Sequence, residues 1–300
     1  IRDSVASRGL GDVYKRQLLS DYSVKCWGKN NLGQLGLGNS SSNDVLTPHT
    51  VTFSGSSTPL SLHAGRNEFC AQLDNGSAAC WGQNADGQFG LGNTTSQTSP
   101  IALTLPTGRT IASMSLAKDF ICMTLDNGSV VCAGRNTEFQ IGQGTTSTRE
   151  LSWKYVVGLD MVAHTVDLGQ DVGCAHLVNG SMVCWGEDVW GFFGNSASSY
   201  AWRSATTASE YVDFGDDRTA ASISVNYRHA CAVLDNGDLT CWGRNHKYQL
   251  GLGNMTQQFM PVVVSNVSSI RQVQIHEMLV DPANDCLLYT SDAADDTPCV

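Results

Sequence analysis

One cysteine-containing segment recurs five times along the 300-residue sequence. Each copy has a cysteine, a tryptophan or alanine, and then a glycine, and the copies are 52 to 57 residues apart. A regular period of this size is typical of solenoids, propellers and other arrays, in which each unit buries its faces against its neighbours. The five cysteines are Cys26, Cys80, Cys132, Cys184 and Cys241.

Each unit has the pattern of a small antiparallel sheet. Two short apolar runs flank a turn, which is Asp74-Asn75-Gly76 in the second unit. Asn-Gly between apolar runs is a strong hairpin signal because both residues tolerate positive φ. No segment shows apolar residues at helical spacing over three turns. We therefore predict an all-β fold in which each unit is a blade of about four strands and the blades pack radially into a β-propeller.

Three copies share a longer glycine-rich signature: CWGKNNLGQLGLGN (26–39), CWGQNADGQFGLGN (80–93) and CWGRNHKYQLGLGN (241–254). This signature resembles the repeats of the regulator of chromosome condensation family, whose members form seven-bladed β-propellers. The resemblance extends from residue 17 to about residue 285, so it implies about five blades of an expected seven. The third unit departs from the pattern at Ala133 and Phe139, and the fourth reads CWGEDVWGFFGNSA.

The two ends of the chain do not contain the repeat. Residues 1–16 and 286–300 resemble translated sequencing-adapter sequence, and we predict that both are non-native ends flanking propeller repeats at 17–285. The chain begins with isoleucine rather than methionine. We therefore expect it to be a fragment of a longer protein.

Eight of the eleven cysteines form pairs ten residues apart around an Asn-Gly turn. With a three-residue loop, the two cysteines of a pair face each other at a non-hydrogen-bonded position, where Cα atoms lie ~4.5 Å apart. This distance is at the near edge of disulfide geometry. Disulfides would indicate an oxidising compartment, whereas reduced cysteines could instead serve as small hydrophobic core residues. The predicted disulfides are Cys70–Cys80, Cys122–Cys132, Cys174–Cys184 and Cys231–Cys241.

Composition and motifs argue against several functions. The net charge of −10 and the lack of a basic run disfavour nucleic acid as a partner, because binding to phosphates needs clustered Lys and Arg. No stretch of 18 apolar residues predicts a membrane span. Gly36-Leu37-Gly38 is not followed by the Lys-Ser/Thr of a phosphate-binding loop. We predict no catalytic residues, no cofactor and no metal site in this chain.

The fourth unit supplies most of the candidate binding surface. Trp190 and Phe192 stand where the second unit has the polar residues Asp86 and Gln88. Exposed aromatic side chains are enriched at binding hot spots, although local repacking of a degenerate blade is the alternative. The candidate surface residues are Trp153, Tyr155, Trp190, Phe192, Tyr200 and Trp202. Candidate glycosylation sites in Asn-x-Ser/Thr sequences are Asn39, Asn93, Asn254 and Asn266.

These features favour a protein-binding propeller module that is secreted or on the cell surface and has no catalysis of its own. The family that the repeats resemble has extracellular members with disulfides. These members support an extracellular binding function, but they do not identify a partner protein. One alternative is an intracellular regulator that catalyses guanine-nucleotide exchange and binds chromatin. A second alternative is a propeller attached to an enzyme domain outside this fragment.

Overall fold

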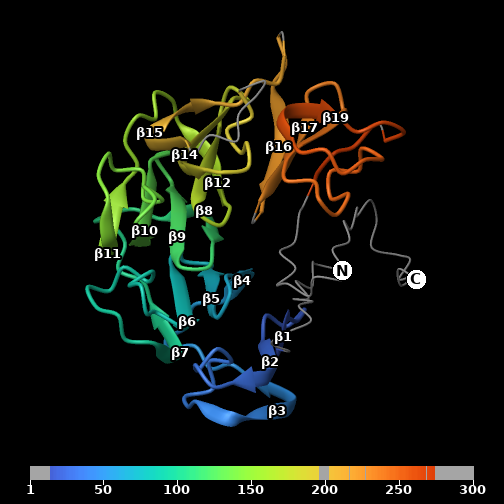
Figure 1. The fold of residues 1–300 in the computed structure, drawn as a ribbon. Coiled ribbons are helices and arrows are strands. Elements are labelled where there is room, and N and C mark those ends of the chain that lie inside the picture. The colour runs from blue at the N-terminus through green and yellow to red at the C-terminus, as the bar shows by residue number, and fades with distance from the viewer. Residues whose placement is uncertain (1–13, 196–202, 216, 227, 268, 274–300) are drawn as a thin grey trace.

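The computed structural model describes residues 14–195, 203–215, 217–226, 228–267 and 269–273, and the described residues form nineteen β-strands and no helix. The strands make five antiparallel sheets, arranged side by side around an arc (Figure 1). Each sheet corresponds to one sequence repeat and is called a blade below. The predicted all-β propeller architecture is confirmed, and within the described residues the arc is open (Figure 1).

Four blades have four strands and the first has three, always in chain order across the sheet. Blade 1 contains β1 (Tyr14–Leu18), β2 (Val24–Asn30) and β3 (Ser41–Thr50). Blade 2 contains β4 (Pro59–Ala64), β5 (Glu68–Leu73), β6 (Ala78–Gly82) and β7 (Gln97–Ala102). Blade 3 contains β8 (Ile111–Leu116), β9 (Phe120–Leu125), β10 (Val130–Asn136) and β11 (Ser147–Tyr155). Blade 4 contains β12 (Ala163–Leu168), β13 (Val172–Leu177), β14 (Met182–Asp188) and β15 (Arg203–Tyr211). Blade 5 contains β16 (Ala220–Val225), β17 (His229–Leu234), β18 (Leu239–Gly243) and β19 (Gln258–Val263).

The hairpin at the middle of each blade has the predicted three-residue loop. In blade 2 the Leu73 N–H donates to the Ser77 carbonyl at 2.8 Å, and the Gly76 N–H donates to the Leu73 carbonyl at 3.0 Å. Gly76 has φ +78°, a conformation that glycine adopts without strain. This loop fixes the strand register so that Cys70 lies opposite Cys80.

The same register brings all four predicted cysteine pairs together. Their Cα atoms are 4.1 Å apart and their sulfur atoms are 2.02 to 2.12 Å apart. The predicted pairing pattern is therefore confirmed. Within a blade, each pair joins the second strand to the third, so the hairpin that carries the Asn-Gly turn is also held at its middle.

Blade 1 lacks this pairing, as the sequence predicts. Arg16 lies opposite Cys26 in the register of β1 and β2, where the other blades have a second cysteine. Arg16 is buried, with its guanidinium carbon 3.1 Å from the centroid of the Phe69 ring in blade 2. Cys26 is a buried free thiol, and burial raises its pKa to about 12. Tyr14 to Arg16 thus form part of β1, while residues 1–13 and 274–300 lie outside the described residues.

Neighbouring blades pack through tryptophan and glycine. Trp81, in blade 2, is fully buried and its indole N–H donates to the carbonyl of Gln34 in blade 1 at 3.1 Å. A Cβ added to Gly36, which has φ +70°, would lie 2.9 Å from Cδ1 of this indole. The repeated glycine therefore allows the next blade to approach. Equivalent indole hydrogen bonds run from Trp185 to Gln140 and from Trp242 to Phe192.

One carboxylate also connects three blades near the centre of the arc. Asp167, on the innermost strand β12, accepts hydrogen bonds from the Ser115 hydroxyl at 3.0 Å and from the Val225 N–H at 2.6 Å. These two partners belong to blades 3 and 5. Burial raises the pKa of Asp167 to about 6, although its hydrogen bonds oppose this shift. The contact fixes the innermost strands relative to one another at the cost of a partly desolvated charge.

Candidate functional site

Each of blades 2 to 5 presents two side chains next to each other at one end of its sheet. One comes from the loop after the innermost strand, and the other comes from the residue directly after the glycine of the third strand. The main-chain N–H of the second residue donates to the carbonyl of the first at 2.8 to 3.0 Å in all four blades. We call these eight residues the charged rim: Asn67 and Gln83, Asp119 and Arg135, Asp171 and Glu187, Arg228 and Arg244.

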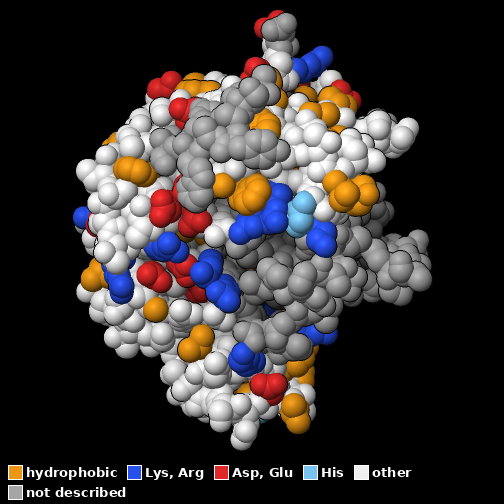
Figure 2. Space-filling model, viewed as in Figure 1, with side chains coloured by type: hydrophobic (Ala, Val, Ile, Leu, Met, Phe, Trp, Pro, Cys, Tyr) orange, Lys and Arg blue, Asp and Glu red, His pale blue; other side chains and the backbone are white. Residues whose placement is uncertain are grey.

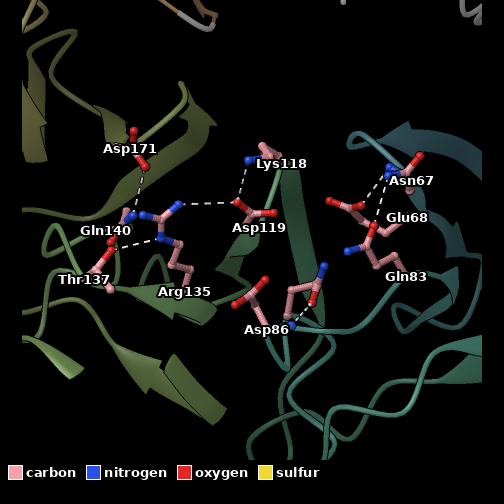
Figure 3. Close-up of polar contacts among 11 residues, drawn as sticks. Asn67, Glu68, Gln83, Asp86, Lys118, Asp119, Arg135, Thr137, Gln140 and Asp171 are labelled. Carbon is pink, nitrogen blue, oxygen red and sulfur yellow. Dashed lines mark hydrogen bonds and ion pairs between the residues drawn. The ribbon is translucent and has the colours of Figure 1, made fainter. Parts of the chain in front are cut away.

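The rim pairs of blades 2 and 3 are matched. The Asn67 amide donates to the Gln83 side-chain oxygen at 2.9 Å. In blade 3, Arg135 lies 3.6 Å from the Asp119 carboxylate, and Lys118 lies 3.3 Å from the same group. Figure 3 shows these side chains in a row, with Arg135 directed towards Asp119. Each rim side chain of these two blades therefore has a hydrogen-bond or ion-pair partner within its own blade.

Blade 4 has two carboxylates at the rim instead. The Asp171 carboxylate accepts a hydrogen bond from the Gln140 amide at 3.0 Å (Figure 3). Among the described residues, no hydrogen bond or ion pair reaches the Glu187 carboxylate. Burial raises the pKa of Glu187 to about 7, and the negative charges of Glu138 and Asp171 add to this shift while Arg135 opposes it. Burial also raises the pKa of Asp171. Two adjacent acids thus share one partly buried position.

Blade 5 has two arginines at the rim, and both lie over an aromatic ring from blade 4. The guanidinium carbon of Arg228 is 5.1 Å from the centroid of the Trp190 ring, and that of Arg244 is 4.7 Å away. These distances are within the range of cation–π attraction. The Nε of Arg228 also donates to the side-chain oxygen of Gln170 at 3.3 Å. The main-chain carbonyl of Trp190 also accepts a hydrogen bond from the side-chain amide of Gln257 at 2.9 Å. Trp190 is therefore held between blade 4 and blade 5.

A hollow of about 220 Å³ lies between the acid pair of blade 4 and Arg228 of blade 5. Its walls are partly apolar and its two sides carry opposite charges. On the face seen in Figure 2, acidic and basic side chains gather towards the middle of the arc. The hollow is lined by Gln170, Asp171, Glu187, Val189, Trp190, Phe192 and Arg228.

The predicted aromatic surface is only partly present. Trp190 lines the hollow and is half-buried. Phe192 is 2 % exposed and belongs to the hydrophobic core, so its assignment to the surface is wrong. The reason is that the equivalent Gln88 is itself buried, with its side-chain oxygen accepting from the Asp86 N–H at 3.1 Å. This position faces inwards even when it is polar. Tyr200 and Trp202 lie outside the described residues.

Trp153 is half-buried and packs against the preceding blade. Blade 3 has Ala133 where blades 2, 4 and 5 have the buried tryptophan, and Trp153 lies in the bulge of β11 opposite Ala133. A Cβ built on Gly90 would lie 2.5 Å from Cε2 of Trp153, so this indole fills the place beside the preceding blade. Trp153 thus has a packing role, and its part in the binding surface stays a prediction. Tyr155 is 49 % exposed but pairs with Val131, at the opposite end of the blade from the rim.

Sequence analysis missed the charged rim, although a signal for it exists. The rim residues lie three positions before the first cysteine of each pair and three positions after the second, as Asp171 and Glu187 do around Cys174 and Cys184. A comparison of these positions between repeats shows one pair of opposite charge, in blade 3, and two pairs of like charge, in blades 4 and 5. The four candidate glycosylation asparagines are all exposed, and their modification stays a prediction: Asn39, Asn93, Asn254 and Asn266.

Within the described ranges, no group of three or more His, Cys, Asp or Glu side chains could hold a metal ion. The part of the chain that the structure describes also contains no helix long and apolar enough to cross a membrane.

Comparison with known proteins identifies the repeat. The model of the regulator of chromosome condensation (RCC1) repeat matches residues 23–71, 75–123 and 236–278, and a second model of this repeat matches residues 220–249. The ultraviolet-B receptor UVR8 of Arabidopsis thaliana is 24 % identical over 277 residues, which cover 91 % of this chain and 61 % of the receptor. The secretion-regulating guanine nucleotide exchange factor of Mus musculus is 27 % identical over 228 residues, covering 75 % of this chain and 48 % of that protein.

A solved structure gives the same result for the fold. A crystal structure of yeast RCC1 (Prp20) bound to Kap60 superposes with a TM-score of 0.76 at 21 % identity, covering 89 % of this chain and 64 % of the yeast chain. The present chain therefore spans about half to two thirds of the length of these proteins. The repeat matches, the relatives and the open arc of four-stranded blades agree: the chain belongs to the regulator of chromosome condensation (RCC1) repeat family.

Proposed function

We propose that this chain is a protein-binding propeller module of a secreted or cell-surface protein, with no catalysis of its own. The charged rim carries the proposal. In blades 2 and 3 the two rim side chains satisfy each other, but in blades 4 and 5 the same backbone positions hold two acids and two arginines. The acid pair of blade 4 disfavours the isolated fold, because like charges repel, and it can be compensated by a positive charge on a docked protein.

Aromatic packing at the rim supports the same function. Trp190 lies beside both arginines and lines the hollow with Glu187. Partly buried aromatic and arginine side chains that surround a hollow are typical of energetically dominant interface residues. The binding test is photo-crosslinking, with p-benzoylphenylalanine placed at Trp190 and, as a control, at Tyr155. We expect a crosslinked partner protein from the native source at position 190 only, whereas crosslinking at neither position would contradict a rim-based binding function.

The proposed compartment rests on the four cysteine pairs, because disulfides persist in oxidising environments. Mass spectrometry of the alkylated protein from its native source tests this part. We expect peptides linked through Cys70–Cys80 and through the three equivalent pairs. If all eight cysteines are alkylated as free thiols, the secreted or cell-surface placement is wrong and the binding function must operate in a reducing compartment.

Guanine-nucleotide exchange is the second candidate function, and the named activity of the mouse relative favours it. That relative is matched over 48 % of its length, so the comparison covers only part of the protein whose activity is named. Release of fluorescent GDP from a Ran-type GTPase, with and without this chain, distinguishes the two. We expect no acceleration, and an acceleration that Glu187→Gln or Asp171→Asn abolishes would favour exchange over simple binding.

A further inference from the structure

We propose that the hollow between blades 4 and 5 binds the basic side chain of a partner protein, with the ammonium or guanidinium group on Asp171 and Glu187. This inference rests on the proposed binding function and specifies its chemistry. It assigns the hollow to a lysine or arginine in an exposed segment of the partner, rather than to an acidic or purely apolar segment.

The first argument comes from the equivalent position in blade 3. There the first rim residue is also an aspartate, Asp119, and the second rim residue, Arg135, supplies its cation at 3.6 Å. In blade 4 the second rim position holds Glu187 instead of an arginine. The blade therefore has no cationic side chain at this position to pair with Asp171. A basic side chain from outside would restore the arrangement of blade 3 and would neutralise two carboxylates rather than one.

The second argument concerns the walls of the hollow. Val189 and Trp190, which are both half-buried, provide apolar surface beside the two carboxylates. Lysine and arginine pack their aliphatic stems on such surface while the charged end reaches polar groups. The volume of about 220 Å³ is many times the ~10–15 Å³ that one water molecule needs on this measure, so the hollow has room for a group larger than water.

The third argument concerns the orientation and number of cations. Arg228 forms the opposite wall and lies over Trp190. Its positive charge repels an incoming cation on that side, so the charged end is directed towards blade 4. The same repulsion limits the hollow to one basic side chain. An acidic side chain entering the hollow would instead meet Asp171 and Glu187, whose pKa values are already raised by burial and by neighbouring carboxylates.

Three matched peptides test the proposal with the whole chain. Each is a glycine–serine decapeptide with two variable positions, occupied by lysine, acetyl-lysine or glutamate. Binding is followed by NMR through the indole N–H resonance of Trp190, assigned by comparison with Trp190→Phe. We expect the lysine peptide to shift this resonance in a saturable manner. The acetyl-lysine peptide keeps the stem and loses the charge, so we expect it to bind at least about tenfold more weakly, and we expect no binding of the glutamate peptide.

Charge-neutral variants identify the carboxylates that contribute. We expect Glu187→Gln and Asp171→Asn each to weaken the lysine peptide about tenfold or more, because each removes one anionic acceptor. Asp44→Asn is the control, since Asp44 is exposed on β3 in blade 1 and the substitution changes the net charge equally. Far-UV circular dichroism confirms that the variants keep the sheet structure.

The possible outcomes separate this inference from the proposed function. If the lysine peptide does not bind, or binds equally well to Glu187→Gln and Asp171→Asn, the assignment of the hollow to a basic side chain is wrong. If position 190 nevertheless crosslinks a partner protein, the binding function stands and the partner uses other chemistry. If neither peptide nor partner is bound, both proposals fail.

Discussion

In blade 3 the tryptophan that packs against the preceding blade comes from β11 rather than from β10. This difference from the other blades gives a prediction about stability. Residue 153 lies in a three-residue bulge opposite Ala133, and the same bulge in blades 2 and 5 ends in Pro100 and Pro261, opposite Trp81 and Trp242. Blade 3 therefore has alanine and tryptophan where these blades have tryptophan and proline. Ala133→Trp combined with Trp153→Pro would restore the arrangement of the other blades.

The two single substitutions should both destabilise the protein. Trp153→Pro removes a largely buried indole beside Gly90, and area-based estimates for a buried aromatic side chain give a loss of roughly 3 kcal/mol. Ala133→Trp adds an indole at a fully buried position while Trp153 still fills the space. Overpacking of this kind costs typically 1–3 kcal/mol, or about 2 kcal/mol here.

The double variant should recover the stability of the wild type. The indole of a tryptophan at position 133 would occupy the place that Trp153 vacates. It could also donate to the carbonyl of Gln88, as Trp81 does to Gln34, whereas the Trp153 indole N–H is buried without a hydrogen-bond partner. That hydrogen bond contributes about 1 kcal/mol. We therefore expect a coupling free energy of about 5 kcal/mol between the two sites, instead of additive losses.

Urea denaturation followed by circular dichroism measures these differences, and amide hydrogen exchange in β9 and β10 shows whether they arise in blade 3. The exchange measurement is needed because arrays of repeats can unfold in more than one step. A double variant no more stable than Trp153→Pro would refute the reasoning. It would mean that Trp153 does not replace the missing tryptophan of blade 3.

Three further predictions concern titration and backbone strain. An NMR titration should show a Glu187 carboxyl pKa near 7, and Glu138→Gln should lower it, because a neighbouring negative charge raises the pKa. A value that Glu138→Gln leaves unchanged would contradict that cause. The pKa of Asp167 is about 6 in the fold, against 3.8 ordinarily, so its protonated form favours folding and this contribution is lost between about pH 4 and pH 6. As the pH rises from 4 to 7, the unfolding free energy of the wild type should fall by up to about 3 kcal/mol relative to that of Asp167→Asn. Parallel pH profiles of unfolding free energy for the two proteins would refute this. Gly36→Ala should destabilise the protein more than Gly92→Ala does. Both glycines have positive φ, but only at Gly36 would the added Cβ lie within 3 Å of an indole atom. Equal losses of thermal stability would show that backbone strain alone acts.

The sequence predicted the architecture because architecture here depends on periodic features. The Asn-Gly turn determines the loop length, the loop length determines which residues face each other, and the cysteines then meet without further information. Blade 1 follows the same logic, with Arg16 found opposite Cys26. A local rule, repeated every 52 to 57 residues, is sufficient to specify the blades and their cysteine pairs.

The candidate surface was harder to predict because exposure depends on the neighbouring blade. Phe192 was assigned to the surface by comparison with a polar residue, Gln88, that is buried and hydrogen-bonded within its own loop. Trp153 was assigned to the binding surface, although it is half-buried and fills a gap that Ala133 creates on the adjacent strand. In both cases residue type suggested exposure, whereas the contact that decides it lies across a strand or a blade boundary.

The charged rim shows how one rigid repeat can carry specificity. Its two positions lie three residues from the cysteines of each pair, and a main-chain hydrogen bond holds them together in each of blades 2 to 5. Substitutions there change the charge of the rim without moving the backbone. Blade 4 therefore presents an acid pair directly beside the arginine pair of blade 5, and their order around the arc is fixed by the order of the repeats. On the proposed binding function, recognition by this face would therefore depend on the positions of the charges around the arc rather than on their net sum.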